Sequence, residues 1–321
     1  MAGFRRLPSS RAAKRTDMHV AWTPDRRSFL AAAAALSLGA LAALPQDSRP
    51  KDLREPDAAP ADGPLVETAG ADAQPAPVPA RAQPPGAPSR DQVIGAFSHR
   101  TAGYWGLAAP GVLSRLPAPA GVALTFDFCG GPGGNAADTG VLTELRRHGV
   151  PATLFLNHRW IAANASLAAE LAADPLFELA NHGTSHRPLS VSGKSAYNIP
   201  GTRNPGEVYD EIMTNDARIA ELTGKRPLFF RPGTAYLDDV SAQIVHALGV
   251  TPVGFSVNGD AGATLPAPAV TKEISGAHAG DIVISHANHP AGGTAAGLAR
   301  ALDAMKQRGE VFVHLPRPAA A

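Results

Sequence analysis

Two histidines four residues apart, His182 and His186, are the strongest chemical signal in the sequence. Imidazoles at this spacing can face one side of a turn and bind one divalent metal ion. The pair alone is weak evidence, because two ordinary surface histidines would show the same spacing. It gains weight from its position directly after the β-rich run 177–180. The pair is therefore a candidate metal site.

Polar and titratable residues follow the other short β-rich runs of the chain as well. The full set is Asp127, Asn157, His182, Arg231, Asn258, Asp260 and His286. In folds built on parallel strands, functional groups gather at the C-terminal ends of the strands. We therefore expect these side chains to meet at one edge of a sheet.

The β-rich runs alternate with helical segments, and this alternation defines the expected fold class. The predicted strands are 122–126, 152–156, 177–180, 228–230, 253–257, 282–284 and 311–313. The predicted helices are 141–148, 160–173, 207–222, 238–248 and 295–307. Short connections between them indicate parallel strands joined by right-handed crossovers. About seven strands in roughly 230 residues favour an α/β barrel over a sandwich.

The N-terminal segment 1–44 is predicted to be an export signal. Basic residues gather in 1–27, and the apolar block 29–44 is too short to span a bilayer comfortably. Arg26 and Arg27 directly precede this block and resemble the twin-arginine export signal. A buried N-terminal helix is disfavoured, because the block is apolar on all sides. We expect an exported protein, periplasmic or extracellular, with no stable membrane anchor after signal cleavage.

Residues 45–90 are predicted to be a disordered linker rich in proline and alanine. They hold 11 of the 30 prolines of the chain and almost no aromatic residues. Such a segment cannot bury enough surface to offset the entropy lost on ordering it. The folded, catalytic domain is expected over residues 91–321.

Charge and cysteine content exclude several classes of protein. Lys and Arg total 29 against 28 Asp and Glu, so no basic excess points to nucleic acid as a partner. Cys129 is the only cysteine, which excludes an intramolecular disulfide and a multi-cysteine metal cage. Apolar residues make up 44% of the chain, which is enough for a packed core.

Five motifs in order along the chain resemble those of the polysaccharide deacetylases of carbohydrate esterase family 4, which share a NodB-like homology domain. The matching segments are 125–127, 178–186, 230–233, 255–260 and 282–286. The resemblance extends from about residue 121 to residue 315, which is essentially the whole folded domain. It implies a deformed (β/α) barrel and metal-dependent removal of N- or O-acetyl groups from an acetylated glycan or oligosaccharide.

The resemblance also implies roles for four residues in the reaction. Asp127 is expected to be the general base that activates water, and Arg231 is expected to keep it ionised and oriented. His286 is expected to be the general acid that protonates the leaving amine or alkoxide. Asp260 is expected to raise the basicity of His286, as a carboxylate beside an imidazole does.

The expected metal site departs from the family pattern at Phe128. The family has a second aspartate there, which ligates the metal together with the residues matching His182 and His186. Asp127 or Cys129 could fill the position, because on an extended strand they share a face and Phe128 points away from it. A thiolate beside two imidazoles favours zinc among the divalent metals. Alternatively, two histidines and waters bind a weak metal, or the protein works without one.

The leading hypothesis is an exported hydrolase of non-peptide carbon–nitrogen bonds that deacetylates a glycan, with Tyr236 and Asn258 binding the substrate. A second hypothesis is the hydrolysis of a non-sugar amide on the same scaffold. A third is a catalytically silent glycan-binding protein that lost its metal with the change to Phe128. Retention of the base, the arginine and the acid histidine favours a working hydrolase.

Overall fold

The computed structural model describes residues 86–317 of the chain. The predicted export signal and nearly all of the predicted linker lie outside these residues. None of the helices between residues 86 and 317 combines the length and the apolar character that crossing a bilayer requires.

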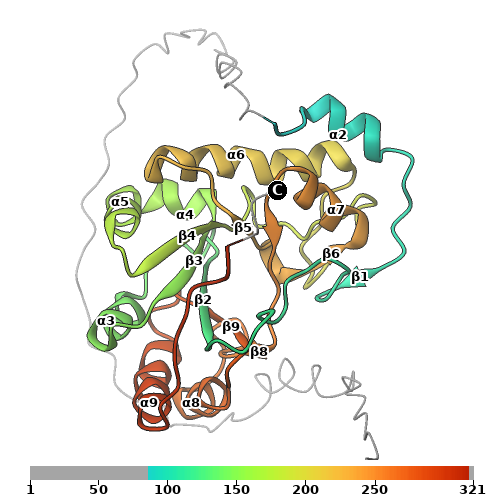
Figure 1. The fold of residues 1–321 in the computed structure, drawn as a ribbon. Helices are drawn as coiled ribbons and strands as arrows, with labels where there is room; N and C mark the ends of the chain where they lie inside the picture. The colour runs from blue at the N-terminus through green and yellow to red at the C-terminus, as the bar shows by residue number, and fades with distance from the viewer. Residues whose placement is uncertain (1–85, 318–321) are drawn as a thin grey trace, which may run out of the picture. The chain divides into compact units, whose positions relative to one another are not determined.

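A sheet of seven parallel strands forms the centre of the fold (Figure 1). The strand order across it is β7-β5-β4-β3-β2-β9-β8. No ladder joins β7 to β8 among residues 86–317, so the barrel is open between these two edges. The predicted deformed α/β barrel of about seven parallel strands is confirmed. In chain order the strands are β2 (Ala123–Phe128), β3 (Ala152–Leu156), β4 (Phe177–Asn181), β5 (Phe229–Phe230), β7 (Thr251–Pro252), β8 (Val257–Asn258) and β9 (Ile282–His286).

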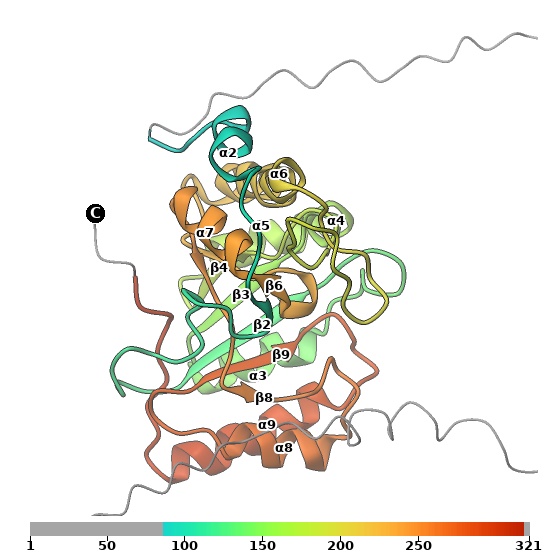
Figure 2. The same ribbon diagram turned by 90° about the vertical axis from the view of Figure 1, so that its right-hand side faces the viewer.

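Helices connect most of the successive strands. They are α3 (Thr139–His148), α4 (His158–Ala163), α5 (Ala165–Ala173), α6 (Pro205–Thr223), α7 (Asp239–Ala247), α8 (Ala267–Ser275) and α9 (Thr294–Gln307). Four predicted helices are confirmed with small shifts at their ends, namely α3, α6, α7 and α9. The helices α8 and α9 lie side by side (Figure 2), and a Cβ on Gly297 of α9 would lie only 2.4 Å from Val270 of α8.

The predicted helix 160–173 is wrong as one continuous element. It is divided into α4 and α5 at Asn164, whose φ of −129° is not helical. The side-chain amide of Asn164 donates to the carbonyls of Asn135 and Trp160. An asparagine that bonds nearby backbone groups in this way competes with helical hydrogen bonding, which explains the break.

The predicted strand 253–257 is also wrong, because the chain leaves the sheet there and returns only at β8. The carbonyls of Val253 and Gly254 accept hydrogen bonds from the guanidinium of Arg231, at 3.4 and 2.8 Å. A Cβ on Gly254 would lie 2.8 Å from Ser114 Oγ, so the segment is closely packed. These carbonyls therefore serve a buried side chain instead of a strand ladder.

The predicted strand 311–313 is a single bridge between Phe312 and Val122, beside the start of β2. Several elements were not predicted from the sequence. They include α2 (Arg90–Phe97), which begins with a capping box at Ser89, α8, and the antiparallel pair β1 (Trp105–Gly106) and β6 (Leu237–Asp238). The pair β1 and β6 lies outside the main sheet.

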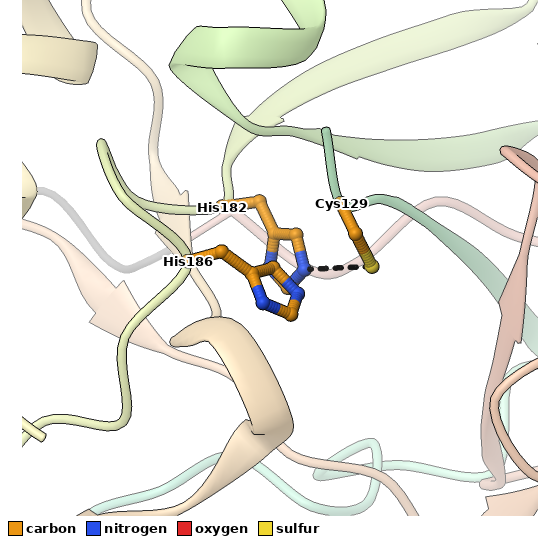
Figure 3. Close-up of side chains that lie close together, drawn as sticks. All are labelled: Cys129, His182 and His186. Atoms are coloured by element: carbon orange, nitrogen blue, oxygen red, sulfur yellow. Dashed lines mark hydrogen bonds between the residues drawn. The ribbon is translucent and has the colours of Figure 1, made fainter. Parts of the chain in front are cut away.

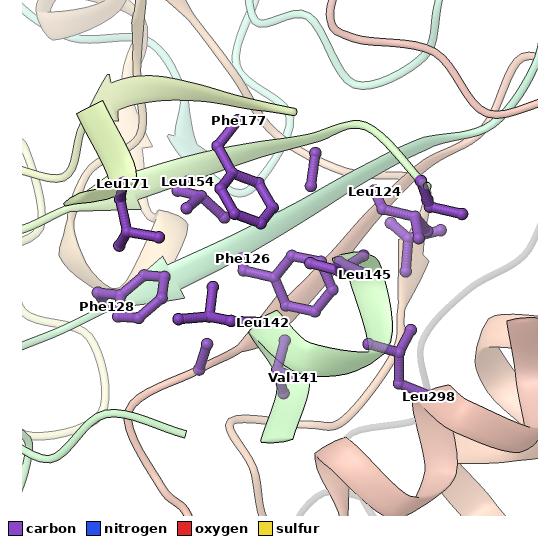
Figure 4. Close-up of a cluster of buried hydrophobic side chains, with 14 of the residues drawn as sticks. Leu124, Phe126, Phe128, Val141, Leu142, Leu145, Leu154, Leu171, Phe177 and Leu298 are labelled. Atoms are coloured by element: carbon purple, nitrogen blue, oxygen red, sulfur yellow. The ribbon is translucent and has the colours of Figure 1, made fainter. Parts of the chain in front are cut away.

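Side chains alternate along β2, and this alternation separates the core from the site. Phe126 and Phe128 point to one face, where they pack in a hydrophobic core with residues of α3 and α9 (Figure 4). Thr125 and Asp127 point to the opposite face, as strand geometry requires. There both accept hydrogen bonds from Arg231. One strand therefore carries part of the core on one face and a buried carboxylate on the other.

Candidate active site

Asp127 and His286 occupy paired positions on neighbouring strands, the first on β2 and the second at the end of β9. Arg231 comes directly after β5, and His182 comes directly after β4. Because all these strands are parallel, the four residues lie at the same C-terminal edge of the sheet. The structure thus brings together side chains that are far apart in the sequence.

Asp127 is buried and paired with Arg231. The Arg231 Nη1 donates to Asp127 Oδ1 at 2.7 Å and to Thr125 Oγ1 at 2.9 Å. Arg231 is itself fully buried, with its guanidinium carbon 4.2 Å from the centre of the Phe155 ring. Burial raises the pKa of Asp127, but the charges of Arg231, His182 and His286 together outweigh burial and hold the pKa below its ordinary value. Asp127 is therefore ionised at neutral pH, as a general base must be.

His286 is paired with a different buried carboxylate. Its Nδ1 lies 2.9 Å from Asp260 Oδ1, and its backbone N–H donates to Asp260 Oδ2 at 2.6 Å. The hydroxyl of Thr294 donates to the same Oδ2 at 3.0 Å. Burial lowers the pKa of His286, but the interactions with Asp260 and Cys129 together outweigh burial and set the pKa well above the ordinary value. A protonated imidazole at this edge can donate a proton to a leaving group.

Cys129, His182 and His186 form a compact group of possible metal ligands (Figure 3). One donor atom from each lies within 4.8 Å of the others. His182 Nδ1 donates to the carbonyl of Arg231 at 2.9 Å, which leaves the lone pair of Nε2 free. This Nε2 lies 3.8 Å from Cys129 Sγ and 3.7 Å from Asp127 Oδ2. The two imidazole rings stand edge to face, with centres 4.9 Å apart.

Phe128, at the position where the resemblance led us to expect an aspartate, is buried on the far side of the strand. Its ring packs on Trp160, with ring centres 4.5 Å apart, and none of it is exposed. Of the two candidates for the third ligand, Cys129 belongs to the compact group of donors. Asp127 is already bonded to Arg231. The geometry therefore favours Cys129.

Three imidazoles surround the Cys129 thiol. Burial raises the pKa of this thiol, but its interactions with the imidazoles of His182, His186 and His286 together outweigh burial and set the pKa well below its ordinary value. The thiolate is the form of cysteine that binds metals. The environment of Cys129 therefore favours the ligating form.

Tyr236 and Asn258 lie at the same edge of the sheet. Tyr236 is half-buried and follows the short helix η1 (Gly233–Ala235). A Cβ on Gly233 would lie 2.3 Å from the carbonyl carbon of His186, so the two backbones are in contact. Asn258 is exposed at the end of β8, and its Oδ1 accepts the N–H of Ala261 at 2.9 Å. Substrate binding by Tyr236 and Asn258 stays a prediction.

Glu211 holds the backbone around His186, and this role was not predicted from the sequence. This buried side chain of α6 accepts the N–H of Ser185 at 2.9 Å and the N–H of Arg187 at 3.1 Å. His186, between them, has a left-handed φ of 60°, which is costly for a residue other than glycine. The available signal was an acidic residue three positions after Val208, on the apolar face of a predicted helix.

Three buried asparagines connect the strand ends to the segment that carries His182. Asn157 Nδ2 donates to the carbonyls of His182 and Gly183, at 2.9 and 2.8 Å. Asn215 Nδ2 donates to Asn181 Oδ1 at 2.9 Å, and Asn181 Oδ1 also accepts the N–H of Gly183 at 2.8 Å. Asn157, which the sequence placed at a strand end, is therefore a structural support of the site.

Comparison with known families agrees with this architecture. Residues 117–253 match the family model described as polysaccharide deacetylase. The peptidoglycan-N-acetylglucosamine deacetylase PgdA of Listeria monocytogenes serotype 1/2a (strain 10403S) is 29% identical over 193 residues, which cover 60% of this chain and 37% of that protein. The uncharacterized protein YlxY of Bacillus subtilis (strain 168) is 25% identical over 175 residues, which cover 53% of this chain and 49% of that protein. The chain thus spans less than half the length of these curated relatives.

Solved structures share the fold. A CE4 family pseudoenzyme from Bacillus anthracis has a TM-score of 0.53 and 22% sequence identity. The superposition covers 64% of this chain and 67% of that one. At this level of identity, the likeness shows a shared fold.

Proposed function

We propose that this chain is a hydrolase of the polysaccharide deacetylase family, whose model residues 117–253 match, and that it removes acetyl groups from an acetylated glycan. The observation that carries the proposal is the pairing of Asp127 with His286, each bonded to a buried partner of opposite charge. An ionised base and a protonated acid therefore face one edge of the sheet. The Listeria relative is named for removing acetyl groups from peptidoglycan N-acetylglucosamine, which supports an N-acetyl sugar as substrate.

The two paired groups divide the proton transfers of hydrolysis between them. Asp127 takes a proton from water as the water oxygen bonds to the acetyl carbon. His286, whose Nδ1 is bonded to Asp260, gives its Nε2 proton to the leaving nitrogen or oxygen as the bond to the acetyl carbon breaks. The products are acetate and the free amine or hydroxyl of the sugar. Arg231 keeps the base ionised until it takes this proton.

The group of Cys129, His182 and His186 fits a divalent metal, and zinc in particular. Sulfur and nitrogen ligands of a tetrahedral zinc ion lie about 3.5 Å apart, given bond lengths of about 2.3 and 2.0 Å. The observed 3.8 Å between Cys129 Sγ and His182 Nε2 is close to this value. Three protein ligands leave one position open, as in catalytic zinc sites. A bound ion would supply a Lewis acid for the acetyl oxygen and a more acidic water.

Export of the enzyme is part of the proposal. Arg26 and Arg27 before the apolar block 29–44 support a twin-arginine route, with residues 1–44 as the signal and 45–90 as a linker. The catalytic domain, residues 91–321, then acts in the periplasm or outside the cell. That location suits a cell-wall glycan such as the peptidoglycan for which the Listeria relative is named.

Acetate release from acetylated chito-oligosaccharides tests the proposal, with metal analysis of the same preparation. We expect release by the wild type and none by Asp127→Asn, whose amide cannot accept a proton. The change to Phe128 supports one competing function, a catalytically silent glycan-binding protein. Glycan binding without acetate release in the metal-loaded wild type would favour that function. Release of acetate only from non-sugar amides would favour the second alternative.

A further inference from the structure

We propose that Trp105, Tyr197 and Tyr236 form an aromatic platform that binds the sugar ring next to the acetylated one; this rests on the proposed function of the site. The ring centres of Trp105 and Tyr236 lie 5.8 Å apart, and those of Tyr197 and Tyr236 lie 5.5 Å apart. The three rings come from β1, from the segment between β4 and α6, and from the residue before β6. They therefore converge from separate parts of the chain on one place.

The aromatic platform presents apolar surface to solvent. Tyr197 is 63% exposed, and the large apolar side chains exposed between residues 86 and 317 are Tyr197 and Val311. Trp105 and Tyr236 are half-buried, so each also keeps part of its ring accessible. One face of a pyranose ring carries mainly C–H groups, which pack well on the face of an aromatic ring. The surface is therefore suited to a sugar ring.

The backbone at Tyr197 indicates that the ring is needed where it is. Tyr197 and Asn198 are the two central residues of a tight turn, in which Ala196 and Ile199 exchange both backbone hydrogen bonds. Their φ values are 51° and 62°, a combination that favours asparagine, aspartate or glycine. A tyrosine is strained in this conformation. Its ring meets Tyr236 edge to face and its hydroxyl is bonded to that of Tyr236, while most of the side chain stays exposed to solvent. The strained turn thus holds this ring beside Tyr236 with a surface open to a ligand.

Asp238 fixes the segments of the platform relative to one another. Its buried carboxylate accepts the N–H of Val191 and the N–H of Ser241, each at 2.7 Å. Its backbone pairs with Trp105 in the ladder of β1 and β6. The platform is therefore held in place before any ligand arrives, which lowers the entropic cost of binding.

The aromatic platform continues directly from the candidate active site. Gly233 is in backbone contact with His186, and Tyr236 lies three residues further along the chain. Three residues span at most about 10 Å, so the first ring of the platform lies near the metal-ligand group. The Lys194 ammonium lies 6.0 Å from the centre of the Trp105 ring and is exposed, so it can move aside when a sugar binds.

The test measures the affinity of acetylated chitotetraose for full-length Asp127→Asn protein by calorimetry, so that turnover does not interfere. Trp105→Ala and Tyr197→Ala, each added to this background, are expected to raise the Kd by about two- to ten-fold, the range of one aromatic contact. Tyr197→Phe keeps the ring and should leave the Kd within about two-fold of the background value. Val311→Ala is the matched control, because Val311 is also large, apolar and exposed, at 58%.

Unchanged affinity in both alanine variants would overturn the aromatic platform, as would an equal loss in Val311→Ala or no binding of chitotetraose at all. The outcomes in the alanine variants are independent of the proposed reaction, whereas a complete lack of binding would count against both proposals. Affinity that depends on the platform, in a wild type that releases no acetate, would leave the platform standing and reject the hydrolase. Acetate release by the wild type, with no effect of the aromatic substitutions on Kd, would support the hydrolase and reject the aromatic platform.

Discussion

The backbone carbonyl of Arg231 accepts the Nδ1 proton of His182 at 2.9 Å. The side chain of the same Arg231 donates to Asp127 at 2.7 Å. One residue thus fixes the tautomer of a candidate metal ligand and the charge of the candidate base. Because the first contact belongs to the backbone, a substitution at position 231 separates the two effects.

Replacing Arg231 should move the acidic limb of the activity profile. Arg231→Met removes the largest of the charges that lower the pKa of Asp127, so this pKa rises and the base becomes protonated at a higher pH. The acidic limb of the pH profile of kcat/KM is expected to move to higher pH, and kcat/KM at neutral pH should fall by about 10²-fold or more. Breaking a buried pair also costs about 3–5 kcal/mol of stability, so thermal unfolding is recorded in parallel. An acidic limb that stays in place in the folded variant would contradict the role of Arg231.

Replacing Asp260 should move the opposite limb. The bond to Asp260 raises the pKa of His286, so the acid stays protonated to a higher pH than an ordinary histidine. In Asp260→Asn that pKa falls, and the alkaline limb of kcat/KM is expected at lower pH. The raised pKa also links the His286–Asp260 pair to the stability of the fold. Its contribution to the free energy of unfolding is complete at pH values below about 6.5, the pKa of histidine in the unfolded chain. The contribution is lost as the pH rises through the pKa of His286 in the folded protein, which unfolding curves at several pH values would show.

Removing the acid should matter most for poor leaving groups. His286→Ala is expected to lower kcat on an N-acetyl substrate by about 10²–10⁴-fold, the usual range for general acid catalysis. An acetate ester of a nitrophenol needs little protonation of its leaving group, so the loss there should be much smaller. Rates on both substrates, measured with one preparation, check this. An equal loss on both would assign His286 another role.

Cys129 should determine the affinity for zinc. Cys129→Ser is expected to lower zinc affinity by at least about ten-fold, because a hydroxyl ligates this soft ion poorly. In the wild type, cobalt in place of zinc should give a thiolate-to-metal absorption band, and Cys129→Ser should lack it. His182→Ala should abolish binding, whereas His289→Ala, at an exposed histidine, should not. Unchanged zinc affinity in Cys129→Ser would leave Asp127 as the alternative third ligand.

Phe128→Asp tests whether a carboxylate at position 128 can reach the metal site. It places a carboxylate where the family has one, but position 128 faces the core and packs on Trp160. We expect a loss of about 3–5 kcal/mol in stability, from the lost ring and the buried charge. No gain in zinc affinity is expected. A stable Phe128→Asp protein that binds zinc more tightly would show that the end of β2 can turn toward the site.

Glu211 should position His186 for metal binding. Glu211→Gln offers one oxygen and one amide to two backbone N–H donors, so the segment around His186 is expected to loosen. Zinc affinity should fall by about ten-fold or less, with a smaller change in the melting temperature of the metal-free protein. Glu221→Gln, on the same helix in a surface pair with Arg218, is the matched control and should change neither. If Glu211→Gln lowered the melting temperature equally with and without zinc, the role of Glu211 would be purely structural.

Much of the site could be predicted because parallel strands place their last residues at one edge. Asp127, His182, Arg231 and His286 each follow a run of apolar, β-branched or aromatic residues that is visible in the sequence. The third ligand could not be decided, because Asp127 and Cys129 share a face of the strand. Only the bond of Asp127 to Arg231 and the grouping of Cys129 with two imidazoles separate them.

The features that sequence patterns missed depend on side chains that bind backbone groups. Asn164 divides a predicted helix through two carbonyls, and Arg231 removes two carbonyls from a predicted strand. Glu211 was missed for the same reason, since its partners are backbone N–H groups of a distant segment. Patterns of apolar residues predict which face of an element is buried, but they do not predict these long-range bonds.

The position of β9 beside β2 has a consequence for the order of folding. Thr125 of β2 donates to the carbonyl of Val283 in β9, although 158 residues separate them. Contacts of such long range form late, because the loop between them must close first. Until the C-terminal third of the chain has been synthesised, β2 is an edge strand with open hydrogen-bonding groups, and the base has no acid opposite it. The nascent chain is therefore prone to aggregate and chemically inactive until its last strand docks, so that completion of the active site coincides with completion of the fold.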